Sequence, residues 1–191
     1  MILDWKNNKE EALANGISEK EKIGVYYVLM EGSLVENYTF RNFENLEFEE
    51  DAFIKNCVFE NCGSLTFDCC TLENCNFSHI DTIYAVDTSL NNSQFKELEC
   101  SNDAVLCLED SVISHCVFDN ITLTNDAYLC DGVGGCLIEE CSFSDIKTSR
   151  QDREIANCTE QTGFIFKREK QISIIDEDTC TGLDEIEYEE A

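Results

Sequence analysis

The sequence predicts an all-β fold: a single-domain parallel β-helix of about six coils, a solenoid of short stacked strands. One phrase occurs six times between Val35 and about Thr148, and in the copy from Ile54 to Cys62 apolar residues occupy the first, fourth, sixth and ninth places. The fourth and sixth places are two residues apart, so both side chains point to one face of an extended segment, whereas the three-residue gaps require turns. A repeat of this kind indicates stacked coils.

A phenylalanine occupies the sixth place of every copy. These residues are Phe40, Phe59, Phe77, Phe95, Phe118 and Phe143. Strands that return to the same place in each coil must run parallel, so their inward residues form ladders. We expect the phenylalanines to stack as rungs of one column, which would direct the acidic side chains outward. Ser93 is the one residue of the repeated pattern that is not apolar.

The steps between the phenylalanines are 19, 18, 18, 23 and 25 residues. The two long steps contain Glu99–Val112 and Thr124–Leu137, which we expect to form loops on the same side of neighbouring coils. Such loops either bind a partner or are insertions that are tolerated because loop length costs little free energy. The glycine-rich stretch Asp131–Gly135 lacks the lysine of a phosphate-binding loop and is expected to form a tight turn.

Residues 1–34 precede the repeats and are expected to form a short helical N-terminal cap, because the open end of a solenoid exposes apolar core and unpaired strand edges. Asp4 can cap a first helix. Ser18 and Glu21 have capping-box spacing for a second helix, although Val25–Leu29 fits a strand equally well.

The repeats end near residue 148, so the predicted β-helix spans 35–148. Residues 149–175 contain two strand-like segments and are expected to form a strand-pair cap or a hairpin for self-association through 164–175. Residues 176–191 form an acidic tail without a basic residue, which is typical of a flexible segment.

Four carboxylates of this tail approximate the spacing of a calcium-binding loop. They are Asp176, Asp178, Asp184 and Glu187. Cys180 replaces an oxygen ligand and Gly182 comes one residue late, so a flexible tail is favoured over a calcium site.

The repeat resembles that of right-handed parallel β-helix proteins over about 115 of 191 residues. The stretches Cys57–Asn61 and Cys116–Asn120 are also similar to the repeat of pentapeptide-repeat proteins, although that family repeats every five residues on all four faces of its coil. No catalytic motif of either family matches residues of this chain.

Forty acidic and thirteen basic residues give a formal net charge of -27. This charge excludes nonspecific binding to nucleic acid or to an anionic membrane and predicts a basic partner. No apolar leader or membrane-spanning run is present, so we expect a cytoplasmic protein. The thirteen cysteines are an odd number and four of them fall in one inward column, which favours reduced, buried thiols.

No catalytic, cofactor-binding or metal-binding residue is predicted. His79 and His115 are the two histidines, and His115 points away from the adjacent inward Cys116, so the two cannot readily share a zinc ion. The coil region offers no basic neighbour that would activate a cysteine. We therefore do not expect an enzyme, and a carbohydrate-active β-helix enzyme is the third choice of function.

Between Lys55 and Lys147 there are sixteen acidic residues and one basic residue, Lys96. Six coils at the ~4.8 Å strand spacing give a charged rod about 29 Å long. The candidate partner-binding residues are Glu97, Glu99, Asp103, Glu109, Asp110, Asp126, Asp131, Glu139 and Glu140.

The leading hypothesis is an inhibitor that imitates nucleic acid and occupies the binding surface of a basic, nucleic-acid-binding enzyme or complex. DNA-like pentapeptide-repeat proteins and acidic phage anti-CRISPR or other anti-defence proteins offer an analogy of class. A structural or homo-oligomeric scaffold is the alternative, and acidity that serves solubility alone is the plain interpretation of the charge.

Overall fold

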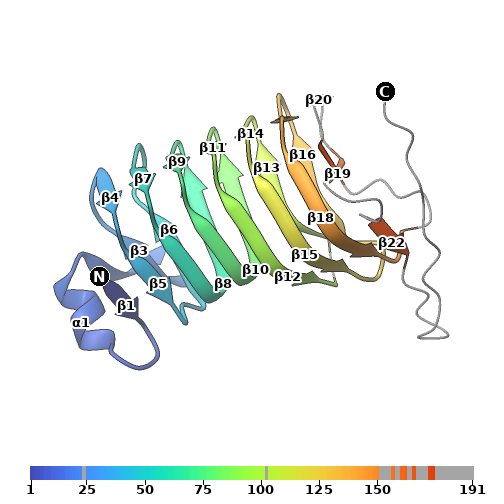
Figure 1. The fold of residues 1–191 in the computed structure, drawn as a ribbon. Coiled ribbons are helices and arrows are strands. Elements are labelled where there is room, and N and C mark those ends of the chain that lie inside the picture. The colour runs from blue at the N-terminus through green and yellow to red at the C-terminus, as the bar shows by residue number, and fades with distance from the viewer. Residues whose placement is uncertain are drawn as a thin grey trace.

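Two β-sheets run along the length of the molecule, and the chain passes between them once in every coil (Figure 1). This computed structural model describes residues 1–22, 25–101, 103–150, 156–157, 160–162, 165–166 and 172–174. In the described residues every strand pairing is parallel except that of β2 (Ile17–Lys22) with β3 (Val25–Met30). The arrangement is all-β, and its parallel sheets are compatible with the predicted β-helix.

The larger sheet has fifteen strands and the smaller one has seven. Besides β2 and β3, the larger sheet contains β1 (Ile2–Asp4), β5 (Thr39–Arg41), β6 (Asn45–Phe48), β8 (Val58–Asp68), β10 (Asn76–Val86), β12 (Gln94–Cys100), β13 (Ala104–Glu109), β15 (Val117–Leu123), β16 (Tyr128–Val133), β18 (Ser142–Thr148), β19 (Ala156–Asn157), β21 (Ile165–Phe166) and β22 (Ile172–Ile174). The smaller sheet contains β4 (Leu34–Glu36), β7 (Phe53–Lys55), β9 (Thr71–Glu73), β11 (Ser89–Asn91), β14 (Val112–Ser114), β17 (Leu137–Glu139) and β20 (Glu160–Thr162).

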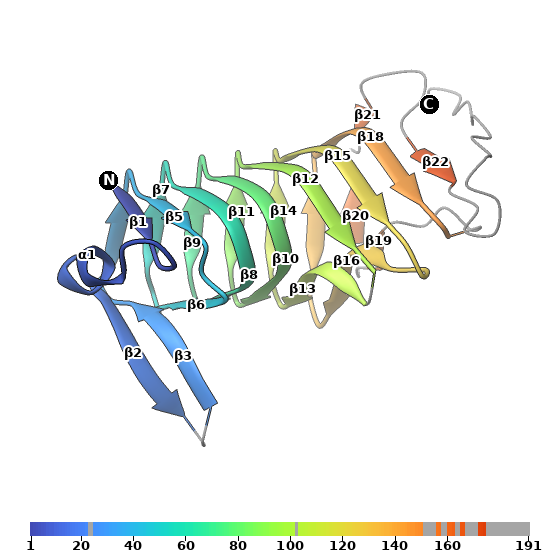
Figure 2. The same ribbon diagram turned by 90° about the horizontal axis from the view of Figure 1, so that it is seen from below.

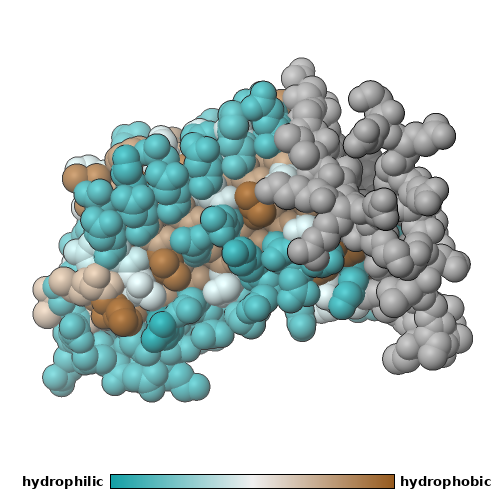
Figure 3. Space-filling view, in the orientation of Figure 1, coloured by the Kyte–Doolittle hydropathy of each residue, from teal (hydrophilic) through white to brown (hydrophobic). Residues whose placement is uncertain are grey.

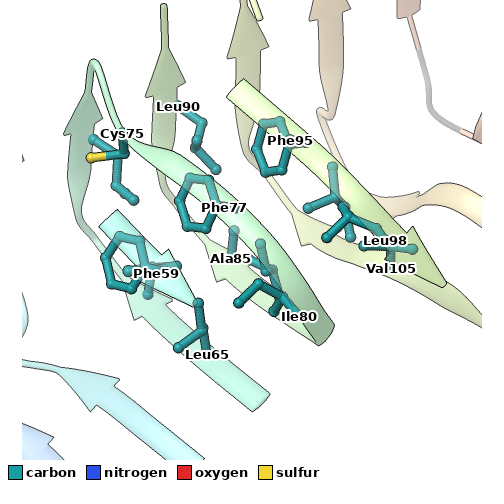
Figure 4. Close-up of a cluster of buried hydrophobic side chains, with 14 of the residues drawn as sticks. Phe59, Leu65, Cys75, Phe77, Ile80, Ala85, Leu90, Phe95, Leu98 and Val105 are labelled. Carbon is teal, nitrogen blue, oxygen red and sulfur yellow. The ribbon is translucent and has the colours of Figure 1, made fainter. Parts of the chain in front are cut away.

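The predicted phenylalanine column is present. The ring centroids of successive residues from Phe40 to Phe143 lie 5.1, 4.8, 4.8, 4.7 and 5.1 Å apart, and the planes of neighbouring rings differ by 6° to 10°. Figure 4 shows Phe59, Phe77 and Phe95 on successive coils with their rings pointing into the core. Stacked aromatic rings stabilise a core beyond the apolar area that they bury. The prediction on which the coil model depended is therefore confirmed.

The first three-residue gap in each copy of the phrase is a turn in which one residue has a left-handed backbone conformation. From the first coil to the sixth, these residues are Asn37, Asn56, Asn74, Asn92, His115 and Glu140, with φ between 50° and 62°. Asparagine tolerates this conformation better than most residues other than glycine. The turn leads from the smaller sheet into the larger one, so the repeated asparagine marks where the chain changes sheets.

The hydrogen bonds at this turn explain why a polar residue, Ser93, can occupy an inward place of the repeated pattern. Its hydroxyl donates to the carbonyl of Asn91 at 2.9 Å and accepts the amide of Cys75 at 3.1 Å. In the equivalent place the thiol of Cys57 donates to the carbonyls of Lys55 at 3.3 Å and Val35 at 3.5 Å. The column therefore requires a small hydrogen-bond donor, which either cysteine or serine supplies.

The two long steps widen the core instead of forming loops. Half of the residues in Glu99–Val112 and Thr124–Leu137 lie in β12, β13 and β16, and Val105 and Leu129 in these strands are fully buried. The short turns that remain stack on one another, because the amide of Thr124 donates to the carbonyl of Cys100 at 2.8 Å. The expectation of loops is therefore corrected: apolar residues within the insertions draw them into the sheet.

The N-terminal segment contains one helix, α1 (Lys9–Ala14), and not two. Asp4 accepts the amide of Asn7 at 3.0 Å within the preceding turn and does not cap the helix. The capping-box pair falls in β2, which pairs with β3 because the run of β-branched and aromatic residues in Val25–Leu29 favours a strand. The β2–β3 hairpin projects from this end of the stack (Figure 2).

The coils continue beyond residue 148. Strand β19 pairs with β16, β20 pairs with β17, and both β21 and β22 pair with β18, all in parallel. The expected strand-pair cap is therefore corrected, since β21 and β22 add to the sheet separately and form no hairpin in their described residues. The acidic tail 176–191 lies outside the described residues. Within the described part of the chain, no helix is long and apolar enough to cross a membrane.

Candidate functional site: an acidic ridge

None of the sixteen acidic residues between Lys55 and Lys147 is buried. This confirms that the inward ladders leave the carboxylates facing water. The carboxylates are not distributed evenly around the coils, however, and their positions follow from the strand register.

Two faces of the stack carry cations beside their carboxylates. On the outer face of the smaller sheet, Lys55 pairs with Glu73 at 3.1 Å. On the first half of the larger sheet, Arg41 donates through Nε to Glu60 at 2.7 Å. In the orientation of Figure 1 the surface shows rows of hydrophilic residues with scattered hydrophobic ones between them (Figure 3).

The remaining face carries carboxylates and has no basic residue in its own segments. It is formed by β6, the second halves of β8 and β10, β13, β16 and the turns that follow these strands, and its segments 44–52, 64–70, 81–88, 103–111 and 128–136 contain no Lys, Arg or His. We call nine of its carboxylates the acidic ridge. They are Glu47, Glu49, Glu50, Asp51, Asp68, Asp87, Glu109, Asp110 and Asp131.

The register of the parallel strands aligns these residues across coils. One outward column runs from Leu29 through Glu47, Thr66, Tyr84, Cys107 and Asp131 to Asn157. A neighbouring outward column contains Asp68 and Glu109, with Val86 between them. In the turn that follows these strands, Asp87 and Asp110 lie on successive coils, which are ~4.8 Å apart.

The pKa of the Cys69 thiol responds to the carboxylates that surround it. Its side chain is exposed, and its pKa is raised first by a hydrogen bond to the carboxylate of Asp68 and then by partial desolvation. The negative charges of Asp68, Asp87 and Asp51 raise its pKa further. Three successive coils therefore direct carboxylates toward the same place.

One ridge residue also supports the fold. The carboxylate of Asp110 accepts the amide of Gly135 at 2.6 Å, and a Cβ atom on Gly134 would collide with it. Gly134 has a φ of 73°, a conformation that glycine adopts readily. The predicted tight turn is therefore present, and it wraps around the carboxylate of the preceding coil.

The structure separates the nine candidate partner-binding residues. Glu109, Asp110 and Asp131 lie on the acidic ridge. Glu139 lies on β17 in the opposite sheet, and Glu140 follows it and contacts Nε2 of His115 at 2.6 Å.

The four other candidates lie at the side where the core widens. Glu97 and Glu99 line a hollow of about 310 Å³ together with His79, and Glu97 lies 3.5 Å from Nε2 of that histidine. Asp103 and Asp126 occupy the stacked turns of the insertions. The carbonyl of Asp126 accepts a hydrogen bond from Nη1 of Arg150 at 2.9 Å.

Six of the nine ridge residues were not among the candidates. They are Glu47, Glu49, Glu50, Asp51, Asp68 and Asp87. The repeated phrase covers only the first part of each coil. The ridge lies on the part of the larger sheet that follows the phrase, so the phrase does not align the ridge residues of different coils. Aligning the inward residues Phe48, Phe67, Ala85 and Leu108 as well would have placed these carboxylates in common columns.

Three of the buried cysteines, Cys62, Cys70 and Cys75, have the chemistry of core residues. Burial raises the pKa of Cys62 and Cys70 to about 11 and that of Cys75 to about 12. A thiol with so high a pKa carries little of the nucleophilic thiolate near neutral pH. Within the described ranges there is no group of three or more His, Cys, Asp or Glu that could hold a metal ion.

Comparison of the chain with models of protein families, with curated proteins and with solved structures finds no match. The function proposed below therefore rests on the geometry and charge of the chain itself.

Proposed function

We propose that this chain is a parallel β-helix protein whose acidic ridge occupies the nucleic-acid-binding surface of a basic partner and thereby inhibits that partner. The observation that carries the proposal is that nine carboxylates lie on one face whose segments 44–52, 64–70, 81–88, 103–111 and 128–136 contain no Lys, Arg or His. A basic groove that binds nucleic acid would attract such a face by long-range electrostatics.

The charge density of the ridge supports this proposal. The ridge extends over five coils, or about 19 Å at the strand spacing of ~4.8 Å. Its nine carboxylates therefore provide roughly one negative charge per 2 Å of the stack, compared with one per about 1.7 Å along duplex DNA and one per about 3.4 Å along a single strand. The rigid stack of coils holds these charges in place before binding, which lowers the entropic cost of association.

The test is capture of partners on the immobilised protein at low and at raised salt. Wild-type protein is expected to retain a nucleic-acid-binding protein at about 0.1 M salt and to release it near 1 M, where the Debye length falls to about 3 Å. Added duplex DNA or RNA should compete for the captured protein. The triple variant Asp68→Asn, Asp87→Asn and Glu109→Gln should lose the capture.

A matched control removes the same number of charges elsewhere. The variant Glu36→Gln, Glu139→Gln and Glu140→Gln changes the opposite sheet and its turn, so it should retain the partner. Equal loss of capture in both triple variants would show that net charge acts without regard to the ridge. Capture that is unaffected by salt and by competing nucleic acid would contradict the proposed inhibition.

A specific feature favours self-association as a second candidate function. At the N-terminal end, β1 pairs only with β5 and β4 pairs only with β7, so each leaves an unpaired edge in the described residues. Ile2 and Leu34 at these edges are 53% and 62% exposed. Residues 1–43 contain five basic and seven acidic residues, so this end repels a second copy less than the rest of the chain does.

Light scattering on a size-exclusion column tests this second candidate. A dimer that becomes a monomer in the variant Leu34→Glu would support pairing through the N-terminal end. A monomer at all concentrations of the wild-type protein would exclude it.

A further inference from the structure

Tyr84 stands out among the outward residues of the ridge face. Its neighbours in the chain, Ile83 and Ala85, are buried in the core, so its side chain points away from the core and is 46% exposed. Large apolar or aromatic side chains are exposed at six places in the described residues, and Tyr84 is the aromatic residue among them. The other five are Met1, Ile2, Leu13, Leu34 and Val133.

The surroundings of the ring suit a flat cation. The residues in register with Tyr84 on the adjacent coils are Thr66 and Cys107, whose short side chains leave the ring raised above its neighbours. Asp68 and Glu109 are both in register with Val86, so they lie diagonally from Tyr84 on the same face, at roughly 8 Å for a strand spacing of ~4.8 Å and a rise of ~3.3 Å per residue. One aromatic ring is therefore flanked by a carboxylate on either side.

The chain already contains one contact of this kind. The guanidinium carbon of Arg150 lies 3.8 Å from the centroid of the Tyr128 ring, and Nη1 of the same side chain donates to the carbonyl of Asp126. Arginine stacks on aromatic rings while its N–H groups bind oxygen atoms at the edge. The strands that flank Tyr84 provide no such cation, since segments 64–70, 81–88 and 103–111 contain no Lys or Arg.

We propose that Tyr84, Asp68 and Glu109 form a binding site for an arginine side chain of the partner. The guanidinium would stack on the ring and donate to one or both carboxylates. Lysine fits this site less well, because its ammonium is a compact and strongly hydrated charge that cannot stack as a plane. This inference rests on the proposed function and deepens it, since it names an arginine-rich segment as the element of the partner that the ridge recognises.

The test compares two peptides of equal length and charge, one rich in arginine and one rich in lysine, titrated calorimetrically into the reduced protein. Wild-type protein is expected to bind the arginine peptide about two- to five-fold more tightly, which is the range for one exposed cation–π contact. Tyr84→Leu should abolish the preference and leave lysine-peptide binding unchanged, whereas Tyr84→Phe should retain it. Phe53→Leu, which alters a half-buried aromatic residue on the opposite sheet, is the matched control.

The outcomes separate this inference from the proposed function. Equal binding of the two peptides, or a preference that survives in Tyr84→Leu, would overturn the arginine site while leaving electrostatic binding by the ridge intact. Failure of both peptides to bind, or equal binding to wild type and to the ridge triple variant, would count against the proposed function itself.

Discussion

Replacing Phe95 with alanine tests the column that holds the coils together. Its ring lies between those of Phe77, at 4.8 Å and 6°, and Phe118, at 4.7 Å and 8°, and it is fully buried. Removal of the ring therefore leaves a cavity in the middle of the stack and breaks two stacking contacts at once.

The magnitude follows from these contacts. Truncation of a buried phenylalanine to alanine costs about 3–5 kcal/mol, and the upper part of this range is expected because the stack cannot collapse around a missing rung without breaking strand pairing. In a chain of this length each kcal/mol lowers Tm by about 2–4 °C, so Tm should fall by roughly 8–20 °C. Phe95→Leu retains most of the volume but loses both ring contacts, so it should cost about 1–3 kcal/mol.

Urea unfolding followed by far-ultraviolet circular dichroism and by tryptophan fluorescence provides the assay. The single tryptophan, Trp5, lies at the N-terminal end, where it stacks on Phe43 at 5.6 Å, so the two signals report different parts of the molecule. Coincident transitions would show that the stack unfolds as one unit. The control is Phe53→Ala on the outer face of β7, which should cost about 1 kcal/mol or less because this side chain is only half-buried.

The comparison with the control decides the result. If Phe95→Ala were no more destabilising than Phe53→Ala, the stacked rings would not be the main source of stability in the core. The assignment of the repeated phenylalanine as the structural centre of the coil would then be wrong.

Four further changes have defined outcomes. Ser93→Ala should cost about 1–3 kcal/mol in urea unfolding because it leaves the amide of Cys75 without its acceptor, whereas Ser93→Cys should cost less than Ser93→Ala. Burial raises the pKa of Cys62 to about 11 and that of Cys75 to about 12, above the ordinary value of 9.0, so both thiols favour the folded state below about pH 9. The free energy of unfolding should therefore fall by roughly 1.4 kcal/mol per pH unit for each thiol as pH rises from about 9 to the folded pKa of that thiol, about 11 for Cys62 and about 12 for Cys75, and Cys75→Ser should make the fall shallower. Gly63→Ala should lower stability by about 1–3 kcal/mol, because its Cβ would collide with a backbone carbonyl of the preceding coil; an unchanged Tm would contradict this. Asp87→Asn should raise Tm slightly by relieving repulsion on the ridge, and it should also weaken capture of a basic partner.

The sequence was sufficient to predict the inward side of the coils. The alternation of Cys57 and Phe59 and the turns on either side follow from local rules, because a strand has a side-chain period of two and asparagine favours a left-handed turn. The core therefore agrees with the prediction residue by residue along the phenylalanine column.

The ends and the insertions could not be predicted in the same way. Ser18 and Glu21 satisfy the local rule for a helix start, but tertiary pairing places them in β2 beside β3. The interruption of the repeat predicts a loop for Glu99–Val112, although the apolar residue Val105 in this insertion is buried and widens the core. In both cases long-range pairing outweighed the local signal.

The acidic ridge could not be predicted from net charge, because charge alone does not specify a face. The strand register shows which carboxylates share a face. A comparison of the turn after each smaller-sheet strand with the turn at the ridge shows whether the backbone requires a carboxylate there. Asn37 and Asn56 have φ values of 62° and 52°, and Asp51 and Asp87 at the ridge have φ values of 62° and 47°, so a neutral residue satisfies the same backbone conformation.

Asparagine and aspartate serve a left-handed turn equally well, yet the chain places the charged residue in the turn where carboxylates of successive coils are closest together. Two unit charges 5 Å apart repel each other by about 0.8 kcal/mol even in water, so each such choice lowers stability without improving the turn. The turn of the smaller sheet holds asparagine in the first four coils, whereas the ridge turn holds aspartate at positions 51, 87 and 110. Other faces carry carboxylates as well, but the segments of the ridge hold no cation beside theirs. A face of this kind is what an extended basic surface would bind.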